Sequence, residues 1–290
     1  MLLGLTHFFA RRGYRCALCT VVLILCSMTL CRGASLSDGD STLLVNPDSS
    51  VMNYSWLIDG VDVFGGSPAG QESFFFSLGN TAPQPLSALT HVVVYNSGGL
   101  LTVKYTDPGE FTILLSDVLS GGTPGSANAS LTELLSIDNK SATNLGLHIF
   151  QFVDFNAAEA HNNYTLSLSS SPTNVANQTD TLGDQFNVAV DVPDEYQIAN
   201  DSSVYMKLTG PTFVPLNDNS VGPISGATNF AFEWDPNISW NGTDQISITE
   251  SVQNRVVPVP SAAWAALSTL AGIAAVAAVR RFRRPAAVEA

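Results

Sequence analysis

Residues 101–106 read Leu-Thr-Val-Lys-Tyr-Thr, and this alternation decides the fold class. Leu, Val and Tyr take every second position with Thr or Lys between them, so one face suits a buried core and the other suits water. Residues 164–169 (Tyr-Thr-Leu-Ser-Leu-Ser) and 245–249 (Gln-Ile-Ser-Ile-Thr) repeat the pattern. A period of two residues is typical of half-buried strands, so these three segments predict a β-rich protein.

Further strand-like segments follow one another at a spacing of roughly ten residues, with turn-forming residues between them. This spacing favours an all-β fold, an antiparallel β-sandwich or jelly roll, over residues 34–255. Residues 129–137 fit either a strand or a short helix, and we expect a strand. We interpret 167–184 as a long surface loop rather than a linker, which leaves one domain. The further strands are expected at 51–58, 72–78, 89–95, 110–118, 130–138, 146–154, 185–191, 203–209 and 228–234.

Aromatic residues supply the bulk of the expected core. A body of about 220 residues is long enough to bury a sizeable two-layer core. The aromatic residues expected inside are Phe74, Phe75, Phe76, Phe150, Phe152, Phe155, Phe230, Phe232 and Trp234.

Basic residues gather at the two ends of the chain, and acidic residues fill the part between them. The 290 residues carry a formal net charge of −13, but 24 of the 25 acidic residues and only four of the 12 Lys and Arg residues lie in 34–255, which gives that part a net charge near −20. Such a body argues against a binder of the nucleic-acid backbone, and we expect no nucleic-acid partner. All four Cys residues precede position 32, so the body has no disulfide, thiolate zinc site or Cys nucleophile.

The first 33 residues have the order of parts of a secretory signal peptide. Three arginines within 11–15 precede the uncharged apolar run 16–31, and small residues follow at 33–35. The apolar run is short for a membrane span. We therefore expect a signal peptide over 1–33. The alternatives are a retained N-terminal anchor and lipid attachment at Cys31.

Residues 261–279 form an uncharged run of nineteen residues, which is long enough for one helical membrane crossing. Basic residues follow at once, and the acidic body precedes the run. The positive-inside rule then places the C-terminus in the cytoplasm and the body outside. A buried core helix is the alternative. The basic cluster consists of Arg280, Arg281, Arg283 and Arg284.

The tail 256–290 resembles the PEP-CTERM sorting signal of bacteria that make exopolysaccharide. That signal consists of a Val-Pro-Glu-Pro motif, a membrane helix and a basic end. The resemblance implies export machinery and an exosortase-like processing enzyme as partners, with cleavage that releases the body to the cell surface. Without cleavage the protein stays anchored. The motif residues here are Val257, Pro258, Val259, Pro260 and Ser261, with Val259 in place of the usual Glu.

The body resembles an uncharacterised β-rich group of PEP-CTERM proteins. The resemblance rests on residues 147–155 (Leu-His-Ile-Phe-Gln-Phe-Val-Asp-Phe), 231–235 (Ala-Phe-Glu-Trp-Asp) and 59–64 (Asp-Gly-Val-Asp-Val-Phe). It supports the β fold and export and implies no activity.

The body has no short motif of a known catalytic class. His91, His148 and His161 show no metal-ligand spacing, and we expect structural or surface roles for them. Neither a nucleophile elbow nor a phosphate-binding Gly loop is present. We therefore expect that the chain is not an enzyme. If two carboxylates do act as a pair, Asp154 and Glu233 in their aromatic strands are the first candidates.

Three turns rich in Asp and Asn favour calcium over zinc because they offer hard oxygen ligands. The same residues are ordinary in tight turns, and that is our main interpretation. We therefore expect no cofactor, with loosely bound calcium as the alternative. The turns are 38–40, 217–219 and 235–237.

These observations predict an exported, C-terminally anchored protein of the cell surface or matrix, with a structural or interaction role. The alternative is an extracellular carbohydrate-binding or carbohydrate-cleaving module with polysaccharide as its partner. Aromatic residues beside carboxylates suit sugar stacking, and Trp234 is the residue on which binding would depend.

Overall fold

The structure, a computed structural model, describes residues 33–64, 71–155, 164–181, 183–218, 221–253 and 269–270. The chain divides into two compact units, Met1–Asn254 and Arg255–Ala290. The predicted signal peptide (apart from residue 33), the sorting motif 257–261 and the arginine cluster 280–284 lie outside the described residues. Of the predicted membrane segment 261–279, only residues 269–270 are described. Within the described part of the chain, no helix combines the length and apolar character needed to cross a membrane.

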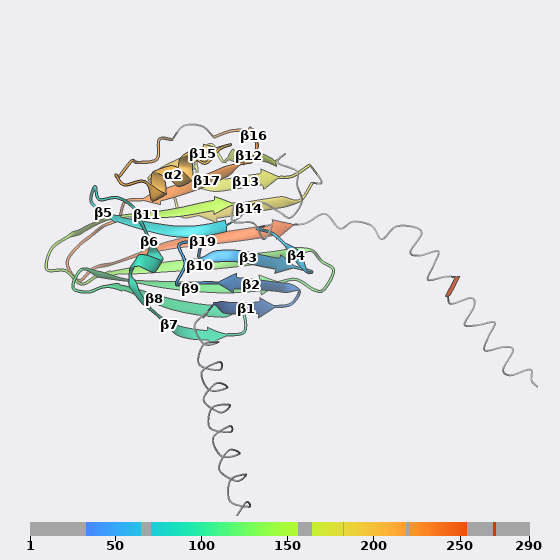
Figure 1. The fold of residues 1–290 in the computed structure, drawn as a ribbon, viewed down its shortest axis with the longest axis horizontal. Helices are drawn as coiled ribbons and strands as arrows, with labels where there is room; N and C mark the ends of the chain where they lie inside the picture. The colour runs from blue at the N-terminus through green and yellow to red at the C-terminus, as the bar shows by residue number, and fades with distance from the viewer. Residues whose placement is uncertain are drawn as a thin grey trace, which may run out of the picture. The chain divides into compact units, whose positions relative to one another are not determined.

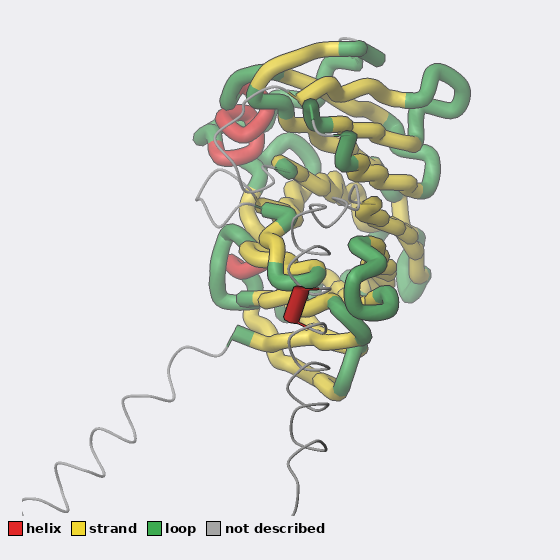
Figure 2. The backbone as a smooth tube through the Cα atoms, turned by 90° about the vertical axis from the view of Figure 1, so that its right-hand side faces the viewer, coloured by secondary structure: helices red, strands yellow, loops and turns green. Residues whose placement is uncertain are grey.

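The strands of the first unit form two antiparallel sheets that pack face to face, which confirms the predicted sandwich (Figure 1). Figure 2 shows the two layers from the side, with helix α2 (Ser203–Thr209) on the outside of one of them. In the described residues the first sheet runs β1 (Ala34–Asp38), β2 (Ser41–Val45), β3 (Asn53–Ile58), β5 (Gln71–Leu78), β11 (Leu145–Asp154), β17 (Asn229–Trp234) and β15 (Glu195–Ala199), with β4 (Val61–Asp62), β6 (Gln84–Pro85) and β18 (Asn237–Ile238) attached. The second runs β16 (Ile224–Gly226), β12 (Tyr164–Leu168), β13 (Val175–Thr179), β14 (Gln185–Val190), β19 (Thr243–Gln253), β10 (Asn128–Asn139), β9 (Phe111–Gly121), β8 (Leu100–Asp107) and β7 (Thr90–Ser97). A short 3-10 helix, η1 (Leu86–Ala88), precedes β7.

The long strands of the second sheet alternate between core and solvent as the sequence predicts. In β10, Leu131, Glu133, Leu135 and Ile137 are fully buried, and the residues that alternate with them are more exposed. The ambiguous segment 129–137 is therefore a strand, as expected, because one apolar face packs against the first sheet. All nine aromatic residues expected in the core are buried.

Two of the expected elements are wrong. Residues 203–209 form helix α2 and not a strand. Val204 and Leu208, four residues apart, share one helical face and are fully buried, whereas Met206 between them is exposed. The segment 167–184 is not one long loop, because it contains strand β13, which pairs with β12 and β14.

The first sheet is covered on both faces at its centre. The inner face packs on the main core, and the outer face carries a second apolar cluster beneath α2 and the segment 210–218. Residues 149–153 of β11 are all buried for this reason, and four of these five residues are apolar, with Gln151 as the exception. The members of this outer apolar cluster are Phe75, Phe150, Phe152, Val204, Leu208, Leu216 and Ala231.

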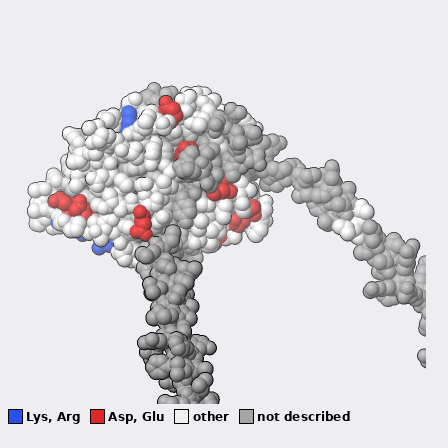
Figure 3. All heavy atoms as spheres, viewed as in Figure 1, with Lys and Arg blue, Asp and Glu red and all other residues white. Residues whose placement is uncertain are grey.

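The acidic residues are not gathered in one patch on the face of the molecule in Figure 3. They lie scattered among uncharged residues on that face. Several other acidic residues, among them Glu72, Glu133 and Glu233, are buried.

Candidate active site

Strand β11 presents alternate residues to the two faces of the first sheet. Ile149 and Val153 belong to the inner core, whereas Phe150 and Phe152 belong to the outer apolar cluster. His148 therefore points to the outer face, at the edge of that cluster. The neighbouring strand β17 sets Glu233 directly opposite Phe150 in the ladder, which carries Glu233 to the same face.

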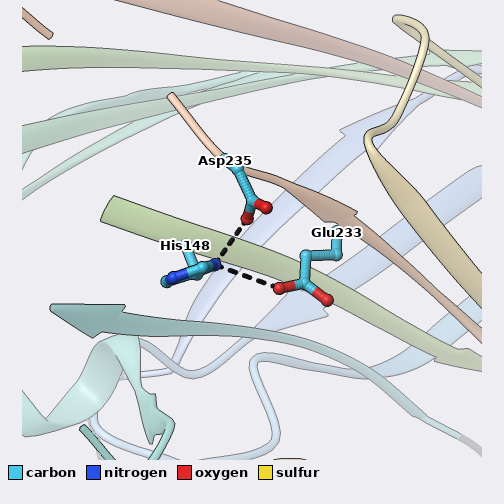
Figure 4. A group of neighbouring side chains, drawn as sticks. All are labelled: His148, Glu233 and Asp235. Carbon is cyan, nitrogen blue, oxygen red and sulfur yellow. Dashed lines mark hydrogen bonds and ion pairs between the residues drawn. The ribbon is translucent and has the colours of Figure 1, made fainter. Parts of the chain in front are cut away.

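His148, Glu233 and Asp235 meet at this edge, as Figure 4 shows. Nδ1 of His148 lies 2.5 Å from Oδ1 of Asp235 and 3.1 Å from Oε1 of Glu233. The other ring nitrogen, Nε2, points away from both carboxylates (Figure 4). Because an ionised carboxylate can only accept, the contact with Asp235 assigns a proton to Nδ1, and Nε2 is the ring nitrogen directed away from both acids.

Glu233 is the most perturbed acid of the site. Its side chain is 1% exposed, and burial raises the pKa of Glu233 to about 8. The carboxylates of Asp235 and Glu195 raise this pKa further, while the backbone N–H of Leu216, 3.1 Å from Oε2, acts in the opposite direction. Glu233 is thus largely protonated at neutral pH and can donate a proton as well as accept one.

The segment 210–218 forms one wall of the site. The ring of Phe213 lies over His148 with 4.5 Å between centroids, and Leu216 donates its N–H to Glu233. Lys207 of α2 holds the segment through a 3.0 Å hydrogen bond to the carbonyl of Pro215. The imidazole is only 20% exposed, so the site is half-sheltered from water.

Chemically, the arrangement offers general acid–base catalysis. A histidine whose Nδ1–H is held by a carboxylate keeps Nε2 oriented to take or give a proton. One atom each of His148, Glu233 and Asp235 lie within 4.8 Å of one another, so the same three groups could also hold a cation.

A second feature on the same face is a pocket of about 280 Å³ near the start of α2. Phe152 and Tyr205 line it, together with Asp154 and Asn229. Burial raises the pKa of Asp154 to about 7. Asn229 donates a hydrogen bond to the carbonyl of Asp201 at the rim, 2.7 Å away.

Asp154 and Glu233, the expected pair of carboxylates, share the outer face without forming a pair. Glu233 lies opposite Phe150, and Asp154 lies four residues further along β11. Four steps along a strand correspond to roughly 13 Å, beyond the separation of about 5–10 Å at which two carboxyls act on one glycosidic bond. The buried side chains of the outer apolar cluster fill the space between them.

The structure corrects the role expected for Trp234. His148, for which a structural or surface role was expected, contacts both Glu233 and Asp235. Trp234 is 5% exposed and donates Nε1–H to the carbonyl of Asp191, so it cannot stack on a sugar. Nε2 of His91 lies 3.0 Å from Oδ1 of Asp48. His161 is outside the described residues.

The three Asp- and Asn-rich turns behave in different ways. Asp38 and Asp40 accept hydrogen bonds from the backbone N–H groups of Gly121 and Gly122, so these carboxylates fasten one loop to another. Asp218 accepts a hydrogen bond from the N–H of Tyr196 in β15. In the third turn Asp235 joins His148. Sequence reasoning missed this last cluster because its members are 85 and 87 residues apart in the chain.

Comparison with known proteins identifies the fold. No protein-family model matches the chain, and no curated protein does. Among solved structures, a putative aldose 1-epimerase from Escherichia coli K12 matches 76% of this chain and 98% of its own, with a TM-score of 0.53 and 12% sequence identity. A galactose mutarotase-like protein from Lactobacillus casei matches 76% of this chain and 100% of its own, with a TM-score of 0.48 and 9% identity.

The expectation that the chain is not an enzyme is wrong on this evidence. That expectation rested on the absence of short catalytic motifs. The chain, however, shares its fold with a putative enzyme, the aldose 1-epimerase. In a β-sandwich, acid and base residues come from separate strands, so no contiguous motif marks them.

Proposed function

We propose that this protein acts on a carbohydrate by proton transfer, with His148, Glu233 and Asp235 as its acid–base group. The observation that carries the proposal is the contact of His148 Nδ1 with both Asp235 and Glu233, which leaves Nε2 directed away from them. Support for a sugar substrate comes from the fold, which it shares with a putative aldose 1-epimerase.

The chemistry that fits is the opening and closing of a cyclic hemiacetal. Opening removes a proton from the anomeric hydroxyl and adds one to the ring oxygen, and closing on the other face gives the opposite anomer. The proton balance is zero, so no co-reactant is needed. Nε2 of His148 can hold one of these protons, and the neutral carboxyl of Glu233 can supply one through the shared network. Asp235 orients the imidazole.

The test is anomer exchange of free hexoses, followed by polarimetry or NMR exchange spectroscopy on the full-length protein. We expect acceleration over buffer that falls by about 100-fold or more in His148→Asn, since a general acid–base group contributes on that order. The matched control is His91→Asn, which removes another half-buried, carboxylate-paired histidine on the opposite sheet and should keep the activity. No acceleration by the wild type, or equal rates in wild type and His148→Asn, would refute the proposal. Activity lost on chelation would point to a metal at the three groups.

We further propose, from the sequence, that the protein is exported and held by its tail. The support is the signal-like segment 1–33, the apolar run 261–279 and the basic end that follows it. Deleting residues 257–290 should then move the body to the medium. A truncated body that stayed in the membrane fraction would contradict this. Terminal sequencing and intact mass of the full-length product would show whether the tail is cut.

A further inference from the structure

Four carboxyl groups lie in the interior of the sandwich, away from the candidate active site on the outer face. Glu72 comes from the first sheet, and Asp117, Glu133 and Glu250 come from adjacent strands of the second. Each of these residues is 0% exposed. We call them the interior acidic cluster.

The interior acidic cluster has no cationic partner among the described residues. The ion pairs that those residues form involve His91, Lys140 and His148, and none reaches the cluster. A carboxylate buried without a counter-charge is very unfavourable, so the fold must neutralise the cluster with protons or with a cation.

The spacing of the carboxyls suits a shared cation. One oxygen each of Glu72, Glu133 and Glu250 lie within 4.8 Å of one another. Two oxygens bound to one Ca²⁺ ion at 2.3–2.6 Å can be at most about 5 Å apart. The three carboxyls are therefore arranged as ligands of one ion would be, from both sheets at once.

Unsatisfied atoms around the cluster are an independent sign of a missing partner. Both carboxyl oxygens of Asp117 are buried and have no hydrogen-bond partner in the described part of the chain, although Asp117 is the direct cross-strand neighbour of Glu133 and faces the same interior. One further oxygen each of Glu133 and Glu250 is in the same condition. Buried polar atoms are normally satisfied, so several in one place require an explanation.

Two amide side chains complete the surroundings. The NH₂ group of Asn53 contacts Glu72 and Glu133, and that of Gln151 lies 2.6 Å from Glu72 and 3.2 Å from Glu250. Their carbonyl oxygens have no hydrogen-bond partner among the residues that the structure describes. Because an amide turned by 180° exchanges N for O, either side chain can present an oxygen to an ion in the cluster.

Protons alone satisfy the cluster poorly. Burial, followed by the neighbouring carboxylates, raises the pKa of Asp117 and Glu133 well above the ordinary range. Shared protons can bridge Glu72 to Glu133 and to Glu250, but neither oxygen of Asp117 has a hydrogen-bond partner among the described residues. A divalent cation between Glu72, Glu133 and Glu250 uses oxygens of these three carboxyls directly and balances two of the four charges, and protons balance the other two.

We propose that the interior acidic cluster binds one Ca²⁺ ion that joins the two sheets. All the available donors are carboxylate or amide oxygens, which selects a hard cation over zinc or copper. Mg²⁺ keeps several water molecules and demands an octahedron at 2.0–2.1 Å, whereas Ca²⁺ accepts six to eight oxygens in flexible geometry. A dry interior with many protein oxygens therefore suits Ca²⁺.

The experiment uses the full-length protein. Because a fully buried ion exchanges only when the sandwich opens, the protein is unfolded in guanidinium with EGTA and refolded with millimolar Ca²⁺, with Mg²⁺ or with EGTA alone. We expect refolding in Ca²⁺ to give one retained ion per chain by elemental analysis and a Tm roughly 5–10 °C above that in EGTA. Mg²⁺ should give a smaller rise.

Variants locate the ion. Glu133→Gln keeps the shape but removes one charge, and it should abolish both the retained Ca²⁺ and the Tm rise. Glu110→Gln, on an exposed turn, should behave as the wild type. Equal Tm and no retained Ca²⁺ in the wild type would overturn the proposal, and so would undiminished Ca²⁺ in a folded Glu133→Gln. If Glu133→Gln does not fold, the wild-type comparison decides alone. The retained Ca²⁺ and the Tm do not depend on activity, so they test the Ca²⁺ proposal independently of the proposed reaction.

Discussion

Phe150 of β11 and Glu233 of β17 are direct cross-strand partners on the outer face of the first sheet. The pairing fixes a carboxyl beside a fully buried aromatic ring. Side-chain neighbours across a ladder are held at about 5 Å, so Glu233 stays beside Phe150 as long as the two strands remain paired. Its environment therefore follows from strand register, and its unusual pKa follows from that environment.

Glu233 should titrate far above an ordinary glutamate. Burial raises its pKa to about 8, so the group should lose its proton near that pH and not near 4.5. Carbon-13 NMR of protein labelled at glutamate carboxyls measures this, with Glu233→Gln identifying the resonance. A resonance that titrates in the ordinary acid range would contradict the prediction. If the proposed reaction uses the neutral carboxyl, the rate should fall as pH rises through the same value.

Asp154 should make the protein less stable as pH rises. Its pKa is about 7 when folded and near 3.8 when unfolded, so its stabilising contribution is complete below pH 3.8 and lost by pH 7. The full difference is on the order of 4 kcal/mol. Asp154→Asn should remove this dependence and gain stability over the wild type in urea unfolding at about pH 8, but not at about pH 4. Asp244→Asn, at an exposed site, is the control; an unchanged pH profile in Asp154→Asn would count against the prediction.

The outer apolar cluster should stabilise α2 through Leu208. Leu208 is fully buried and Met206, on the same helix, is 60% exposed. Leu208→Ala should cost about 2–5 kcal/mol in guanidinium unfolding. Met206→Ala should stay within about 0.5 kcal/mol of the wild type. Similar effects of both substitutions would show that α2 does not pack on the sheet as described.

Asn139 should be a critical polar residue at the end of β10. Its Nδ2 lies 2.8 Å from the carbonyl oxygen of Thr143 and 2.9 Å from that of Ile238, and its Oδ1 accepts the N–H of Ser141. Asn139→Ala leaves these buried groups unpaired and should cost about 3 kcal/mol.

The matched control is Asn128→Ala, because Asn128 is the exposed asparagine at the other end of the same strand. It should change stability by less than about 0.5 kcal/mol. Chemical unfolding of both variants at one pH decides between the outcomes. An Asn139→Ala protein as stable as Asn128→Ala would mean that the loops around residue 139 are held by other contacts.

Strand prediction succeeded where one face of the sheet is wet. In β8 and β10 the alternation of apolar and polar residues records the two environments directly. It failed at 203–209, where Val204 and Leu208 fit both a helix and a strand in so short a segment. The helix forms because Val204 and Leu208 pack on the apolar surface of β11 and β17 beneath that segment. The sequence of residues 203–209 contains no information about this surface.

The sequence by itself determined the all-β class, the buried aromatic residues and the charge of the body, because each follows from composition or from a period of two residues. The tertiary structure alone decided which acids meet. His148 faces Glu233 and Asp235 across a ladder, and Glu72 faces Glu133 across the sandwich. Such contacts between side chains depend on strand order and register, which are set by the packing of the whole core and not by neighbours in the chain.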